Sequence, residues 1–192
     1  MQVILGVSNR HVHLKEEDYK ILFGNEPLNK VKDLRQPGQF ASDKFVTIQN
    51  EDRKIEHVRI LGPIRNYTQV EISKTDAYTL KLNPPIRESG DLKNSSPITI
   101  IGPKGTLNLK EGCILANRHI HISEEEVKKY HLEGVKKVKV KIEGEKGGIL
   151  NNVHLKVQEP SLLEMHIDID EGNAFNVKTG DILEITELER ED

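Results

Sequence analysis

The segment GVSNRHVHL, residues 6–14, returns in altered form as LANRHIHIS, residues 115–123. The shared Asn-Arg-His-x-His core recurs 108 residues further on, and its two copies contain four of the eight histidines. Self-similarity of this kind is the signature of a duplicated structural unit. The repeat therefore predicts that the chain of 192 residues is built from two similar halves.

The surroundings of the two motifs also resemble each other. Each motif is followed by a short helical pattern, which we expect to end at Gly24 in the first half and at Gly134 in the second. In the second half, Ser123 and Glu126 have the spacing of a capping box at the start of the helix. Further along, residues 44–60 and 136–155 alternate apolar and polar side chains on both sides of a turn, which is typical of paired, half-buried strands.

Alignment of the two halves through these strands changes the offset from 108 to 95 residues, which requires one insertion of 108 − 95 = 13 residues. The insertion falls within residues 25–42, a stretch with two prolines that we expect to be a loop. Beyond the insertion, the alignment places Glu71 of the first half opposite His166 of the second. Both are expected midway along an alternating strand.

The boundary between the halves is expected within residues 82–97, which are rich in proline, serine and glycine. We therefore predict one half at residues 1–95 and the other at residues 96–192, with a hairpin around the Gly-Pro-Lys-Gly turn at residues 102–105. Many short strands with close turns favour small barrels over a parallel sheet. The predicted fold class is mainly β: two similar β-barrel halves from an internal repeat, each capped by a short α-helix.

The composition excludes several classes of partner. Net charge is 28 − 31 = −3, which does not favour a nucleic-acid or anionic membrane partner, and no apolar run is long enough for a membrane helix. Cys113 is the only cysteine, so no intramolecular disulfide can form and a reducing compartment is favoured. Because the N-terminal residues also lack the pattern of a targeting leader, we expect a cytoplasmic protein.

The histidine motifs predict metal binding. On a strand, His-x-His places both imidazoles on one face, and the repeat alignment supplies a third donor in each half. Structural zinc sites are usually rich in cysteine, so histidines with a carboxylate favour zinc in one or two open sites. The other histidines, His57, His131 and His154, have no partner at ligand spacing and are expected at the surface. The predicted ligands are His11, His13, Glu71, His119, His121 and His166.

Five separated motifs in a fixed order give the sequence a resemblance to a known family. They are VSNRHVHL (7–14), LGPIRNYTQVEISKTDA (61–77), RESGDL (87–92), ANRHIHI (116–122) and LEMHIDIDEGNA (163–174). The sequence resembles the PduL-type phosphate acyltransferases, the phosphate propanoyltransferase family, over nearly its whole length. The resemblance implies two β-barrels with two zinc ions, an active site between the halves, and the reaction acyl-CoA + phosphate ⇌ acyl phosphate + CoA.

The resemblance also implies roles for individual residues. Glu71, His119, His121 and His166 look like the ligands of one zinc ion, and His11 and His13 like ligands of the other. Arg65, Gln69, Ser89 and Gly90 are similar to residues that bind phosphate, and Arg65 is the expected catalytic residue. Val7, Ser8, Asn9, Arg59 and Asn173 are similar to residues that bind CoA. Two positions depart from the family pattern: Gly172, where alanine is frequent, and His154, where arginine is frequent.

These expectations combine into a hypothesis for the reaction. Arg65 orients phosphate beside the thioester carbonyl, while one zinc ion polarises that carbonyl and the other receives the CoA sulfur. The acyl group, acetyl or propanoyl, is left open. The short segment before the first motif favours a cytosolic enzyme outside bacterial microcompartments. Alternatives are a cupin-like metal protein, because acids closely follow each His-x-His; a metal-dependent thioesterase; and a metal-binding or CoA-binding module without catalysis.

Overall fold

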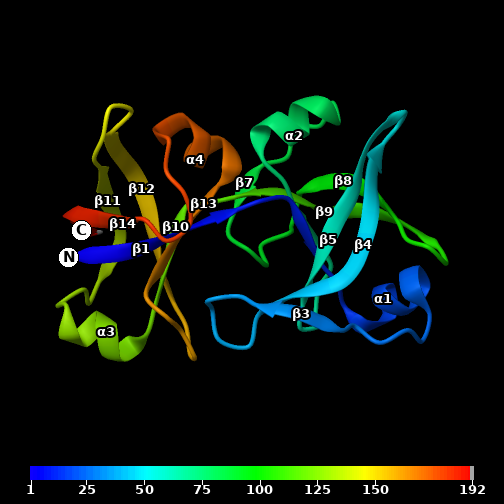
Figure 1. The fold of residues 1–192 in the computed structure, drawn as a ribbon, viewed down its shortest axis with the longest axis horizontal. Coiled ribbons are helices and arrows are strands. Elements are labelled where there is room, and N and C mark those ends of the chain that lie inside the picture. The colour runs from blue at the N-terminus through cyan, green and yellow to red at the C-terminus, as the bar shows by residue number, and fades with distance from the viewer. Residues whose placement is uncertain (191–192) are drawn as a thin grey trace. The chain divides into compact units, whose positions relative to one another are not determined.

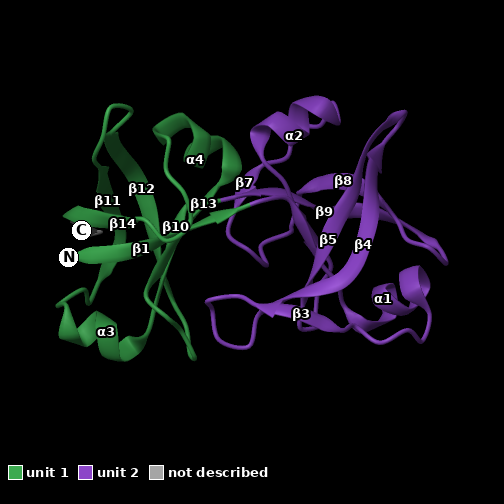
Figure 2. Ribbon diagram, in the orientation of Figure 1, with its two compact units in different colours: residues 1–8, 117–192 green, residues 9–116 purple. Residues whose placement is uncertain are grey.

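The structure, a computed structural model, describes residues 1–190 and divides into two compact units. Unit 1 combines Met1–Ser8 with the chain from Asn117 onward, and unit 2 is the intervening Asn9–Ala116 (Figure 2). Figure 1 labels their helices and strands. No helix in the described part of the chain is long and apolar enough to cross a membrane.

Unit 2 contains one connected sheet of eight strands and two helices. Its elements are β2 (His11–His13), α1 (Glu16–Phe23), β3 (Lys30–Asp33), β4 (Phe40–Asn50), β5 (Arg53–Gly62), β6 (Gln69–Glu71), α2 (Lys74–Thr79), β7 (Ile86–Arg87), β8 (Ser96–Ile101) and β9 (Thr106–Ala116). Six of the strands close a barrel in the order β4-β5-β2-β6-β9-β8, with β8 returning to β4. Strands β3 and β7 extend it at β4 and β9.

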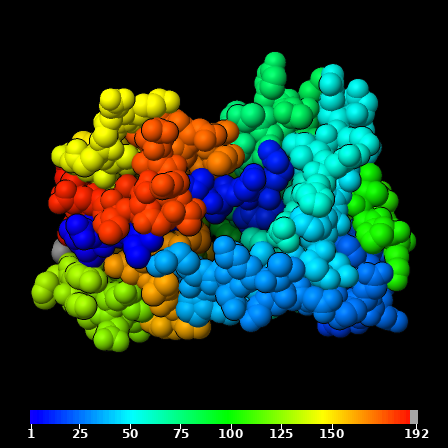
Figure 3. Space-filling view, in the orientation of Figure 1, coloured from blue at the N-terminus to red at the C-terminus, as the bar shows by residue number. Residues whose placement is uncertain are grey.

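Unit 1 is also a closed barrel of six strands. Its elements are β1 (Gln2–Ser8), β10 (His119–Ile122), α3 (Glu124–Lys129), β11 (Val135–Ile142), β12 (Gly148–Val157), β13 (Glu164–Asp168), α4 (Ile169–Phe175) and β14 (Ile182–Arg190). The strand order is β1-β13-β10-β12-β11-β14, and the N-terminal strand β1 lies beside the C-terminal strand β14 (Figure 3). The predicted fold class is confirmed.

The two barrels share one pattern of strand directions. Strand β10 is parallel to β12 and antiparallel to β13, as β2 is parallel to β5 and antiparallel to β6. Strand β1 is parallel to β13 and antiparallel to β14, as β9 is parallel to β6 and antiparallel to β8. The duplication seen in the sequence is therefore a duplication of topology.

The first strand of each repeat belongs to the barrel of the other repeat. Strand β1 precedes the first histidine motif but pairs with β13 and β14, whereas β9 precedes the second motif but pairs with β6 and β8. The predicted hairpin at residues 102–105 is present, and it joins β8 to β9 within unit 2. The unit boundaries consequently differ from the division predicted at residues 95 and 96.

Alternation along the strands builds a separate core in each barrel. In β11, Val138, Val140 and Ile142 point inward and are buried, while the lysines between them lie on the outside. Strand β2 places Val12 in the core of unit 2 and β10 places Ile120 in the core of unit 1. The histidines on either side of these residues must then face outward from their barrel.

The local structure departs from the sequence-based expectations in three places. A second helix follows β6 and β13, because capping boxes at Ser73 and Asp168 end the expected strands early. The expected loop at residues 25–42 contains β3, an exposed edge strand paired with β4. Helix α3 has the predicted capping box at Ser123 but ends at Lys129, before Gly134, which lies in the turn that leads into β11.

Candidate active site

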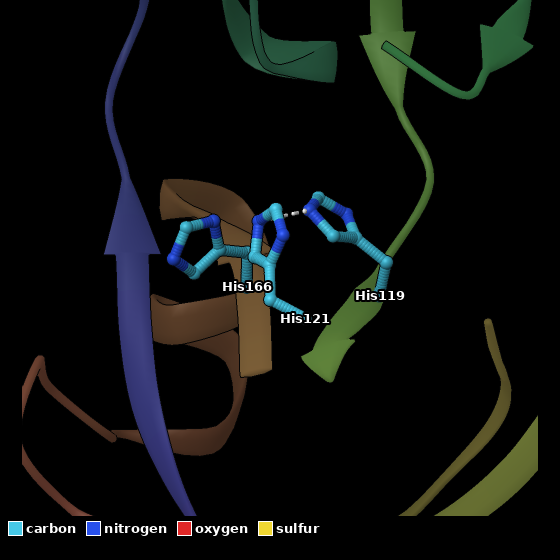
Figure 4. Close-up of side chains that lie close together, drawn as sticks. All are labelled: His119, His121 and His166. Carbon is cyan, nitrogen blue, oxygen red and sulfur yellow. Dashed lines mark hydrogen bonds between the residues drawn. The ribbon is translucent and has the colours of Figure 1, made fainter. Parts of the chain in front are cut away.

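Three histidines converge in unit 1. His119 and His121 come from β10, and His166 comes from the adjacent β13, where it lies in register with His119. One ligand nitrogen from each lies within 4.8 Å of the others, and Nε2 of His119 is 3.1 Å from Nε2 of His121 (Figure 4). Three imidazoles at this spacing form a donor set suited to a divalent metal such as zinc.

The protonation of these histidines suits metal binding. Nδ1 of His119 lies 2.8 Å from the backbone carbonyl oxygen of Asn117, so Nδ1–H donates there and the Nε2 lone pair is directed at the cluster. His121 is only 7% exposed. Burial, together with His119 and His166, lowers the pKa of His121 to about 2, so the ring stays neutral. A metal requires the neutral imidazole, so the ring of His121 fits it.

The first histidine motif repeats this arrangement in unit 2. Nδ1 of His11 lies 2.8 Å from the carbonyl oxygen of Asn9, and the rings of His11 and His13 are 4.9 Å apart. On the adjacent strand Glu71 is in register with His11, as His166 is with His119, which confirms the repeat alignment. Oε2 of Glu71 is 3.7 Å from Nε2 of His11. Two imidazoles and a carboxylate thus lie together here.

The four residues predicted to bind phosphate are brought together in unit 2. The Arg65 guanidinium donates to the hydroxyl of Tyr67 at 2.6 Å, to Oε1 of Gln39 at 3.1 Å and, at 3.4 Å, to the hydroxyl of Ser89. These three acceptors are neutral groups, and within residues 1–190 no carboxylate lies at hydrogen-bond distance from the guanidinium. Because its charge is not compensated by a carboxylate at hydrogen-bond distance, the guanidinium can receive an anion.

Gln69 connects the arginine cluster to the carboxylate of Glu71. Its side-chain amide donates to Glu71 Oε2 at 2.9 Å and to the Ser89 hydroxyl at 3.0 Å. Its carbonyl oxygen accepts from the backbone N–H of Gly90 at 2.8 Å. Phosphate would therefore have to displace the Gln69 carbonyl oxygen to make the predicted contact with the Gly90 N–H. The positive φ of 98° at Gly90 is the conformation that aims this N–H inward.

Comparison with known proteins identifies the family. The sequence profile of phosphate propanoyltransferase matches residues 4–178. Over 188 residues the chain is 48% identical to phosphate propanoyltransferase of Thermotoga maritima, covering 97% of this chain and 90% of the relative. It is 43% identical to that of Rhodopseudomonas palustris (96% and 82% covered) and 46% identical to that of Salmonella typhimurium (88% and 81% covered).

The chain belongs to the phosphate propanoyltransferase family. The resemblance found from the five motifs is confirmed, and the predicted enzyme class is that of the family. The acids that prompted the cupin-like alternative have another role. Glu16 and Glu17 lie in the first turn of α1, and Glu124 and Glu125 in that of α3, where negative charge stabilises a helix.

The residues predicted to bind CoA are distributed over both units. Val7 and Ser8 end β1, and Asn173 lies in α4, all in unit 1. A Cβ at Gly172, the residue before Asn173, would lie 3.0 Å from Cγ1 of Val7, so an alanine at this position would press on β1. Asn9 lies in unit 2, where its side-chain oxygen accepts from the Arg10 N–H.

Arg59, the remaining predicted CoA residue, forms part of a stack on the outside of unit 2. Its guanidinium lies 4.3 Å from the centre of the Phe45 ring, and His57 stacks on the same ring at 3.7 Å. His57 and His131 are exposed, as predicted. His154 is instead half-buried and in register with His119. At the offset of 95, His154 aligns with Arg59 of the first half. Arg59 is in register with His11, so the two residues hold equivalent positions beside the histidine strands.

The arginine of each histidine motif has a structural role that the sequence analysis missed. Arg10 is 2.7 Å from the Asp76 carboxylate, and Arg118 is 2.7 Å from that of Glu171. Both acids occupy the third position of a helix capping box, in α2 and in α4. Each ion pair therefore ties a histidine strand to a helix of the same unit. The invariance of Asn-Arg-His between the two copies was the available signal.

Proposed function

We propose that the protein catalyses transfer of an acyl group between CoA and phosphate, acyl-CoA + phosphate ⇌ acyl phosphate + CoA. The observation that carries the proposal is the Arg65 guanidinium, which is held by Tyr67, Gln39 and Ser89 but has no carboxylate partner within residues 1–190. An arginine fixed by neutral acceptors is suited to a bidentate contact with phosphate. Family membership supports the choice of phosphate and an acyl thioester as substrates.

In the proposed reaction, Arg65 orients phosphate so that one of its oxygens attacks the thioester carbonyl carbon. A carbon–oxygen bond forms, the carbon–sulfur bond breaks, and CoA leaves as the thiolate, so no covalent acyl-enzyme is required. Gln69 and Ser89 hold the phosphate side of the site through their mutual hydrogen bond of 3.0 Å. Fixing phosphate in this way converts a bimolecular encounter into an oriented reaction.

We further propose that two zinc ions are bound by the predicted donors His11, His13, Glu71, His119, His121 and His166. The support is the convergent triad His119, His121 and His166 and the backbone carbonyls that orient His11 and His119. Bound zinc supplies stabilisation of the negative charge that develops on the thioester oxygen and on the departing sulfur. Val7, Ser8, Asn9, Arg59 and Asn173 are proposed to bind CoA, and acetyl-CoA and propanoyl-CoA are the proposed acyl donors.

Release of free thiol from acetyl-CoA and propanoyl-CoA, measured with and without phosphate, tests the proposal. We expect release that depends on phosphate and is accompanied by formation of acyl phosphate, trapped as the hydroxamate. Equal release in the absence of phosphate would identify a thioesterase and contradict the proposal. Absence of release under both conditions, in protein shown to contain zinc, would favour a binding module. The ratio of the two rates would assign the preferred acyl group.

A further inference from the structure

Unit 1 contains a buried carboxylate that the proposed function does not use. Glu164 lies in β13, two residues before His166, so the two side chains emerge on the same face of the strand. The residue is only 2% exposed. Its Oε2 is 3.1 Å from Nε2 of His166. A carboxylate is seldom buried so completely without a specific partner, and one partner here is an imidazole of the histidine triad.

The backbone of the neighbouring strand leaves room for this pair. Gly6 of β1 is in register with His166, and a Cβ at Gly6 would lie 2.8 Å from Cδ2 and 3.0 Å from Nε2 of His166. The same Cβ would lie 3.1 Å from Oε1 of Glu164. The His166 ring and the Glu164 carboxylate therefore occupy the space that a side chain at position 6 would need. In unit 2 the residue of β9 in register with Glu71 is Ile114, so the glycine is found only beside the histidine copy.

We propose that Glu164 is a positioning residue that accepts a hydrogen bond from Nε2–H of His166. This bond fixes the tautomer in which Nδ1 of His166 carries the lone pair. Figure 4 shows one ring nitrogen of His166 on the side of His121, and Nε2 is the nitrogen beside Gly6 and Glu164. The inference deepens the proposed function and rests on metal binding by the triad.

The proposed triad then uses its nitrogens unequally. His119 donates Nδ1–H to the carbonyl of Asn117 and presents Nε2, whereas His166 donates Nε2–H to Glu164 and presents Nδ1. A carboxylate acceptor is stronger than a backbone carbonyl and raises the basicity of the ligating nitrogen. Loss of such an outer partner typically weakens metal binding by about 10–100-fold. Glu164 itself is not one of the three residues whose ligand atoms lie within 4.8 Å of one another, so it is assigned as a partner of a ligand and not as a ligand.

The tautomer can be measured directly, with or without metal. Two-bond ¹H–¹⁵N correlation spectra of the metal-free protein should show His166 protonated at Nε2, and addition of zinc should shift the Nδ1 resonance. A His166 protonated at Nδ1, or bound to zinc through Nε2, would overturn the inference. Because the metal-free spectrum decides the tautomer by itself, a failure of zinc binding would count against the proposed metal site and not against the pairing of Glu164 with His166.

Zinc affinity provides the second test. In protein carrying His11→Ala and His13→Ala, competition with a chromophoric chelator should report on the triad alone. Glu164→Ala should weaken zinc binding by about 10–100-fold. Glu164→Gln should weaken it less, because the amide oxygen still accepts from Nε2–H. Gly6→Ala should also weaken it, because the new Cβ displaces the pair. The matched control is Glu184→Gln, an exposed acid on β14 of the same barrel.

The fold of each variant is checked by far-UV circular dichroism and thermal unfolding. If Glu164→Ala does not fold, the comparison of Glu164→Gln with Glu184→Gln still separates a local effect from a global one. Folded Glu164→Ala protein that binds zinc as tightly as its parent would refute the role of Glu164. A purely structural role would lower the melting temperature while leaving the tautomer of His166 unchanged, and this result would refute it as well.

Discussion

Removal of the Arg65 side chain should abolish most of the phosphate-dependent activity. Two charge-assisted hydrogen bonds to phosphate would be lost in Arg65→Ala, each contributing about 1.5–3 kcal/mol. Together they amount to about 3–6 kcal/mol, and since 1.4 kcal/mol is a factor of ten, kcat/KM for phosphate should fall by about 10²–10⁴. Arg65→Lys should give an intermediate loss, because an ammonium keeps the charge but cannot bind bidentately.

The same variant should leave the metal content unchanged. The hydrogen-bond partners of Arg65 are Tyr67, Gln39 and Ser89, and none of them belongs to the predicted zinc ligands. The assay is thiol release from acyl-CoA at varied phosphate concentration, together with elemental analysis for zinc. Arg53→Ala, at the exposed start of β5, is the matched control. Phosphate-dependent activity at the level of the unmodified protein, or loss of zinc from Arg65→Ala, would refute the assignment.

Three further outcomes are expected. His119→Ala should lose zinc and activity together, measured by elemental analysis and the thiol assay, and retention of all the zinc would contradict the predicted ligand set. Cys113 is buried, and burial raises the pKa of its thiol to about 12, so Ellman's reagent at pH 8 should detect no thiol in the native protein and one after denaturation. Arg10→Ala should lower the free energy of unfolding by about 1–3 kcal/mol, because the Asp76 side chain, 4% exposed, would lose the ion pair with Arg10, whose own side chain is 35% exposed. Denaturant titration checks this last value, and Arg118→Ala should give a smaller loss, because the side chain of its partner Glu171 is 21% exposed.

The arrangement of the donor residues was largely predictable because strands obey a simple rule. His-x-His with an apolar residue between the histidines places Val12 or Ile120 in a core and the imidazoles outside. Alignment of the repeats then placed Glu71 and His166 correctly on the strand beside each motif. Strand periodicity and the similarity of the two repeats can both be read directly from the sequence, and the structure keeps both.

Partners distant in the sequence were harder to predict. Nothing in the alternation of β1 or β9 specifies which barrel the strand completes, because a strand offers the same backbone hydrogen bonds to any neighbour. The capping boxes at Ser73 and Asp168 are visible in the sequence, yet the helices they begin have only six and seven residues. Helices so short give too little periodic signal to displace a strand assignment.

The polar partners of the site depended on side-chain placement. Tyr67 follows Arg65 by two residues, but the chain bends at residues 66 and 67, so strand alternation does not predict their contact, and Gln39 lies in the stretch expected to be a loop. The two-residue spacing of Glu164 and His166 is also visible in the sequence. The room for their contact depends on Gly6, which is 160 residues away from His166 and lies beside the pair only because β1 belongs to this barrel.

The exchange of β1 and β9 has a consequence for the history of the chain. A protein consisting of one repeat would end after β8, and if its strands paired as they do in this chain, its first strand would complete the barrel of a second copy. Two identical copies that traded this strand would complete each other, which is the geometry of a domain-swapped dimer. The duplicated gene would then have fused an obligate homodimer into one polypeptide. Once the copies were covalently joined, one could keep a histidine at the third donor position while the other acquired a glutamate.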